Sequence, residues 1–143
     1  MPTFSDAEKA AMKERAREQR EFKKLSGEEQ VRVKIADMNP HEKKIAQGIH
    51  DLVTSIDERL KPQTWYGMPA YYLDGKVVCF FQAGSKFESR YSTFGFQEQA
   101  KLDDGDMFAT SFAVIDFTPK VAEQISKLVR KACLLYTSDA ADE

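Results

Sequence analysis

The sequence predicts an α+β fold in which helices pack on one face of an antiparallel sheet of four to five strands. Three observations predict this fold. Apolar residues recur at helical spacing from Ile45 to Leu60, the dipeptide Asp74-Gly75 separates two strand-like runs, and an amphipathic helical pattern follows the strands. Helical and strand patterns are segregated along the chain, which favours an antiparallel sheet over alternating βαβ units. A length of 143 residues makes one folded domain the default.

The composition indicates a soluble, cytoplasmic protein with a real core. Hydrophobic residues make up 42% of the chain and include 10 Phe, 5 Tyr and 1 Trp. No run approaches the roughly 18 apolar residues of a membrane span, and residues 1–24 lack the apolar segment of a signal peptide. Two cysteines form no disulfide framework, which fits a reducing compartment. A net charge of −2 argues against nucleic-acid partners and against membrane steering.

Residues 1–25 are expected to form a charged helical extension outside the domain. Ser5 and Glu8 have the spacing of a capping box, and strong helix formers continue to Leu25. The apolar residues of this segment are too few to make a wide stripe. We therefore expect a solvated N-terminal helix, and a charged arm that binds a partner is the alternative.

The domain itself is expected to span residues 26–132 and to begin with two helices. Ser26 and Glu29 form a second capping box before a short helix. Asn39 at the N-cap and Pro40 at the first helical position then open the core helix. This helix should end near residue 59, because Pro62 disfavours helix at the residue before it. His50 is expected at the boundary of the core rather than as a metal ligand.

The strands should follow as hairpins. Asp74-Gly75 is typical of a type I′ turn, which needs positive φ at both positions. Gly95 suggests a bulge or a strand end, and residues 97–101 a helical turn. Thr118 and Pro119 should open the last helix. Four strands are predicted, over residues 70–73, 76–82, 87–96 and 107–117.

Residues 64–71 read TWYGMPAY and lie where helical patterns give way to strand patterns. Further motifs follow: GKVVCFFQ at 75–82, KF at 86–87, RY at 90–91, FGF at 94–96 and LDDG at 102–105. Together they resemble the YdhG-like domain family over residues 28–132. One departure is MFAT at 107–110, where relatives tend to carry a Trp-Pro pair.

The resemblance implies a frataxin-like or YjbR/CyaY-like sandwich. Most members of that group have no assigned activity, and one branch is described as an iron chaperone that delivers iron to cluster-assembly proteins. Hard cations need clustered oxygen ligands, and the best cluster in the sequence is Asp103, Asp104 and Asp106. An ordinary solvated turn is the alternative for this loop.

The sequence favours a binding protein over an enzyme. It contains no phosphate loop, no CxxC or HExxH motif and no recognisable nucleophile constellation, and Cys79 lies among apolar strand residues. The competing hypothesis to iron delivery is a module that binds a small anion or a peptide on an aromatic and basic sheet face. Packing of helix against sheet is the alternative role for the aromatic residues. The candidate ligand-binding residues are Trp65, Tyr66, Tyr71, Lys86, Arg90 and Tyr91.

Residues 133–143 are expected to be a non-native tail. All of them can be back-translated into one reading frame of a transposon adapter used in sequencing libraries. Cys133 is therefore expected to carry no function, and Cys79 to be the only native cysteine. The last native helix could continue beyond residue 132.

Overall fold

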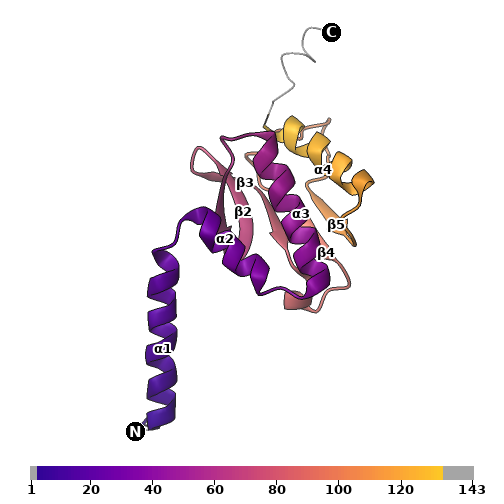
Figure 1. Ribbon diagram of the computed structural model, residues 1–143. Coiled ribbons are helices and arrows are strands. Elements are labelled where there is room, and N and C mark those ends of the chain that lie inside the picture. The colour runs from indigo at the N-terminus through magenta and orange to yellow at the C-terminus, as the bar shows by residue number, and fades with distance from the viewer. Residues whose placement is uncertain (1–2, 134–143) are drawn as a thin grey trace.

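The computed structural model describes residues 3–133 and confirms the predicted α+β class. In the described part of the chain, four helices accompany a five-stranded antiparallel sheet with strand order β1-β2-β3-β4-β5 (Figure 1). Within that part, no helix is long and apolar enough to cross a membrane. The helices are α1 (Asp6–Lys23), α2 (Gly27–Ala36), α3 (Pro40–Ile56) and α4 (Pro119–Ala132), and the strands are β1 (Lys61–Trp65), β2 (Met68–Leu73), β3 (Lys76–Gln82), β4 (Ser92–Phe96) and β5 (Ser111–Val114).

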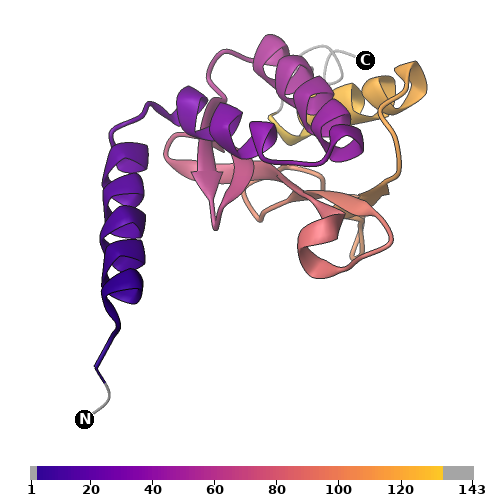
Figure 2. The same cartoon turned by 60° about the horizontal axis from the view of Figure 1, so that its bottom comes forward.

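The predicted helix starts are confirmed. Ser5, Ser26, Asn39 and Thr118 each occupy an N-cap, and each side chain accepts a hydrogen bond from a backbone N–H of the first turn. The helix α1 has no buried residue, and it projects away from the rest of the chain in both views (Figures 1 and 2). The helices α2, α3 and α4 lie on one face of the sheet (Figure 2).

Two tight hairpins organise the first half of the sheet. Asp74 and Gly75 have φ values of 51° and 81°, as the predicted type I′ turn requires. The motif at residues 64–71 is itself a hairpin, because Tyr66 and Gly67 have φ values of 50° and 76° between β1 and β2. The strand β1 was not individually predicted, and it accounts for the fifth strand of the sheet.

The two later strands are shorter than predicted. Residues Gly84–Phe87 form a 3₁₀ helix, and Glu88 follows with a φ of 52°, so β4 begins only at Ser92. The strand β5 covers four residues of the predicted segment 107–117. Of the two alternatives for Gly95, the bulge is wrong, because β4 keeps a continuous register with both neighbours there, whereas β4 does end one residue later, at Phe96. The register shift of the sheet lies between Tyr71 and Tyr72 of β2.

The main core lies between the sheet and the helices. Its largest fully buried side chains include Phe81 and Phe94 from the strands, and Ile45 and Ile49 from α3. His50 also belongs to this set with 1% exposure. Its predicted position at the core boundary is therefore wrong: α2 and β2 cover both ring nitrogens with hydrogen-bond partners.

Candidate functional site

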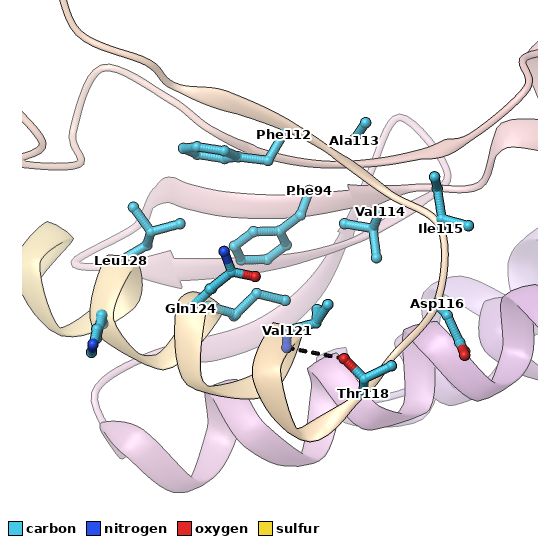
Figure 3. A pocket seen from close by; sticks show the side chains of 12 residues that line it. Phe94, Phe112, Ala113, Val114, Ile115, Asp116, Thr118, Val121, Gln124 and Leu128 are labelled. Atoms are coloured by element: carbon cyan, nitrogen blue, oxygen red, sulfur yellow. Dashed lines mark hydrogen bonds between the residues drawn. The ribbon is translucent and has the colours of Figure 1, made fainter.

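An apolar groove lies between the edge strand β5 and the helix α4 (Figure 3). Its volume is about 700 Å³, within the range of roughly 300–1,000 Å³ that is usual for ligand sites. Phe94 lies beneath the groove and points toward α4, while Leu128 points from α4 toward Phe112 (Figure 3). The lining residues are Phe94, Phe112, Ala113, Val114, Ile115, Asp116, Thr118, Val121, Gln124, Ile125, Lys127 and Leu128.

Local sequence rules explain the wall that α4 forms. Thr118 caps α4 through the N–H of Val121 at 3.2 Å, which fixes where the helix begins. Ile125 is buried, whereas Val121 and Leu128 are only partly buried. The helix α4 packs mainly against α3 rather than against β5. The apolar side of α4 that faces β5 is therefore left incompletely covered.

The groove continues into a second hollow of about 630 Å³. Phe112 and Leu128 line both hollows and so divide one groove into two parts. Large apolar side chains are exposed around it: Met107 by 89% and Ile115 by 66%. Contiguous exposed apolar surface on a small protein commonly marks an interaction site.

The backbone of β5 is open on the side away from β4. The strand is the last of the sheet, and the N–H of Phe96 donates to the carbonyl oxygen of Thr110 at 2.8 Å. Hydrogen-bonded and non-hydrogen-bonded pairs alternate along an antiparallel ladder. With the observed register, the peptide groups of Ser111 and Ala113 therefore point away from β4.

Charged groups stand at the rim of the groove. The carboxylate of Asp116 accepts a hydrogen bond from Lys44 at 3.0 Å, and this contact lowers the pKa of Asp116. Lys127 pairs with Glu123 at 3.2 Å on α4.

The walls contribute no cysteine, histidine or serine nucleophile. The arrangement suits binding of apolar side chains rather than covalent chemistry.

The structure does not bring the six predicted ligand-binding side chains onto one surface. Trp65 packs against Phe80 with ring centroids 5.3 Å apart, and Tyr66 is 86% exposed at the hairpin turn. Lys86 lines a separate small cavity beside Gly67. Another cavity, of about 110 Å³, is lined by Arg90 and Tyr91 with the Arg90 guanidinium 5.4 Å from the Tyr91 ring.

The prediction that Tyr71 lines a ligand surface is wrong, because its side chain has 0% exposure. The hydroxyl lies 2.9 Å from Nδ1 of His50, and Nε2 of His50 lies 2.9 Å from Oε1 of Glu28. This carboxylate–imidazole–hydroxyl chain has the order of a catalytic triad. Burial raises the pKa of Tyr71 well above its ordinary value. With no access for a substrate, the chain is structural.

The predicted metal residues lie in an exposed loop. Asp103, Asp104 and Asp106 are all solvent-exposed, and an isolated bridge joins Asp104 to Asp106. Within residues 3–133, no three His, Cys, Asp or Glu side chains are placed to share a metal ion. Asp57, the C-cap residue of α3, is paired with Arg59, whose Nη2 donates a hydrogen bond to its carboxylate at 2.7 Å.

Both cysteines are buried. Burial raises the pKa of the Cys79 thiol well above its ordinary value, which keeps the sulfur in its unreactive protonated form. Cys133 follows α4, and burial raises its pKa to about 11. The rest of the predicted non-native tail, residues 134–143, lies outside the described residues.

The groove was missed by sequence reasoning for an identifiable reason. The apolar stripe of α4 was recognised, but the predicted strand at 107–117 was too long to mark 111–114 as a short edge strand. The usable signal was the concentration of apolar residues at Met107, Phe108, Phe112 and Ile115 beside a helix with a matching stripe.

Comparison of the chain with protein-family models, curated proteins and solved structures finds no match. The resemblance to the YdhG-like family, and with it the frataxin-like fold, stays a prediction.

Proposed function

We propose that this protein is a non-enzymatic peptide-binding module. The ligand is an extended, apolar segment of another protein that adds to β5 as a sixth strand. Alternate side chains of the segment enter the groove between β5 and α4, in the manner of strand addition to an exposed sheet edge. The proposal keeps the peptide-binding alternative that the sequence suggested and moves it from the aromatic sheet face to the edge of the sheet.

The single observation that carries the proposal is the position of the groove along an unpaired strand edge. The backbone N–H and C=O groups of Ser111 and Ala113 are placed to form hydrogen bonds with the backbone of another strand. A row of such groups suits an extended peptide better than a small molecule. Side chains in a strand alternate between the two faces. An added strand would therefore direct every second side chain toward Phe112 and Leu128, the two apolar residues that line both parts of the groove.

Substituting Ala113 by proline tests the backbone contact. A peptide selected from a phage-displayed hexapeptide library, carrying a fluorescent label, serves as the probe in an anisotropy titration. We expect Ala113→Pro to weaken its binding by about tenfold or more, because proline removes an outward N–H from the edge strand. The N–H groups that bond to β4 belong to other residues and remain intact.

Ala113→Ser is the matched control, since it keeps the N–H and the side chain at this position points away from α4 (Figure 3). Selected peptides should carry apolar residues at alternate positions. Equal binding to Ala113→Pro, or selection of peptides without that alternation, would contradict strand addition. A dimer that Ala113→Pro converts to a monomer would instead identify a second copy of the chain as the occupant.

Iron delivery, which the family resemblance implies, stays a prediction attached to the acidic loop. Its expected result is micromolar ferrous-iron binding by titration calorimetry that is lost when Asp103 and Asp104 are both changed to asparagine. Glu98→Gln is the control, because Glu98 is an exposed acid outside the loop. Absence of any binding heat in the unmodified protein would remove iron from consideration.

A further inference from the structure

A smaller cavity of about 240 Å³ has no part in the peptide groove. It lies between the connection from α2 to α3 and the turn between β1 and β2. Gly67, Met68 and Pro69 line it, so it draws on the same motif that stands out in the sequence. None of its lining residues lines the groove beside β5.

A buried carboxylate without a counter-cation forms part of the wall. Glu42 is 7% exposed, and its two oxygens accept hydrogen bonds from the N–H and the hydroxyl of Ser85 at 2.8 and 2.7 Å. No ion pair joins Glu42 to any lysine, arginine or histidine among the described residues. A carboxylate can accept about four hydrogen bonds, so capacity for a donor remains. Glu42 lies in the first turn of α3, where the helix N-terminus favours a negative charge, and a cationic ligand group would add the counter-charge that no side chain supplies.

Two lysines complete the polar part of the lining. The ammonium of Lys34 lies 5.0 Å from the ring centre of Phe22, and that of Lys86 lies 3.5 Å from the carbonyl oxygen of Gly67. In the described part of the chain, neither lysine is ion-paired with an acid. Asp37 and Glu42 balance their charges, so the lining carries both signs and no net charge.

Asn39, the N-cap residue of α3, also lines the cavity. The apolar part of the lining comes from Met38, Met68, Pro69, Phe81 and Ala83. The volume of the cavity is below the roughly 300–1,000 Å³ of sites for drug-sized molecules. Methionine side chains adapt readily to ligands of different shape. These features favour a small molecule that combines a cation, an anion and a short apolar chain.

We propose that this cavity binds a small zwitterion of the class of an apolar α-amino acid. The ammonium of the ligand donates to Glu42, its carboxylate lies between Lys34 and Lys86, and its side chain contacts Met38 and Phe81. The site is independent of the peptide groove, and neither proposal requires the other.

Three probes of matched shape test the ligand chemistry: L-leucine, 3-methylbutylamine, which lacks the carboxylate, and 4-methylpentanoate, which lacks the ammonium. We expect millimolar leucine to raise the Tm of the protein and to give a saturable calorimetric isotherm. The two analogues should do neither at the same concentration, because each carries only one of the two charged groups of leucine.

Variants test the residues. Lys34→Ala combined with Lys86→Ala should weaken leucine binding by about tenfold or more, whereas Lys76→Ala, in the distant β2–β3 hairpin, should leave it unchanged. Glu42→Gln should abolish binding. If Glu42→Gln does not fold, the lysine variants carry the test alone, since Lys86 is exposed. An unchanged Tm and no heat with leucine, equal effects of the analogues, or undiminished binding by the double lysine variant would each overturn the proposal.

Discussion

Substituting Gly27 by alanine is expected to destabilise the protein by about 1–3 kcal/mol, although alanine is the better helix former. In an exposed helix interior, the same change stabilises by roughly 1 kcal/mol. Gly27 is the first residue of α2, and a Cβ atom there would overlap the carbonyl oxygen of Pro62 in β1. Because that obstacle is backbone, α2 must shift against the strand that it packs on. Urea denaturation followed by the fluorescence of Trp65 measures the change.

Gly48→Ala in α3 is the matched control. A Cβ atom at Gly48 would meet the ring of Phe117 rather than a main chain, and a half-buried side chain can rotate away. We therefore expect a smaller loss than for Gly27→Ala. A Gly27→Ala variant that is as stable as the unmodified protein, or more stable, would show that α2 and β1 are not packed as closely as described.

The parts of the fold that depend on local chemistry could be predicted from the sequence. An N-cap needs only a side-chain oxygen and the N–H groups that follow it, and all four expected caps are present. The Asp74-Gly75 turn is likewise set by two residues that tolerate positive φ. The turn between β1 and β2 was harder to recognise. Tyr66 has a positive φ there, which tyrosine residues rarely adopt.

The candidate site depended on tertiary contacts, and here sequence reasoning was weaker. The ring of Trp65 packs at a tilt against the ring of Phe80, whereas the hydroxyl of Tyr71 bonds to His50 of α3. Strand alternation and the register shift after Tyr71 separate side chains that are close in the sequence. The groove arises because α4 packs mainly against α3 rather than against β5, and no short-range sequence pattern encodes that choice of packing partner.

The hydrogen-bonded chain Glu28–His50–Tyr71, in which His50 and Tyr71 are buried, is expected to be the most sensitive polar feature of the core. Ionised Glu28 can only accept a hydrogen bond, so Nε2 of His50 carries the proton toward it. In the neutral ring, Nδ1 then accepts from the hydroxyl of Tyr71. Both nitrogens are satisfied, and no buried polar side-chain atom among the described residues lacks a partner.

Tyr71→Phe should therefore destabilise the protein by about 1–3 kcal/mol, because it leaves a buried acceptor on His50 without a donor. His50→Ala should cost more, about 2–5 kcal/mol, since it adds a cavity to the lost hydrogen bonds. Tyr72→Phe, at the half-buried neighbouring position, is the control and should change stability by less than about 0.5 kcal/mol. A neutral Tyr71→Phe would show that His50 does not depend on the hydroxyl.

The same chain predicts a pH dependence whose sign follows from Glu28. Burial alone raises the pKa of this carboxyl, but hydrogen bonds from His50 and Arg32 outweigh burial and hold the pKa below its ordinary value of 4.5. A folded-state pKa that is depressed contributes stability above the unfolded value and loses it as the pH falls through the folded value. Stability should therefore decline on acidification below about pH 4.5, and less steeply in His50→Ala, where Glu28 has lost one of the two donors. Parallel urea titrations of both proteins between neutral and acid pH measure this difference. If the free energy of unfolding fell equally steeply with pH in both, His50 would not be holding the carboxylate of Glu28 in its ionised form.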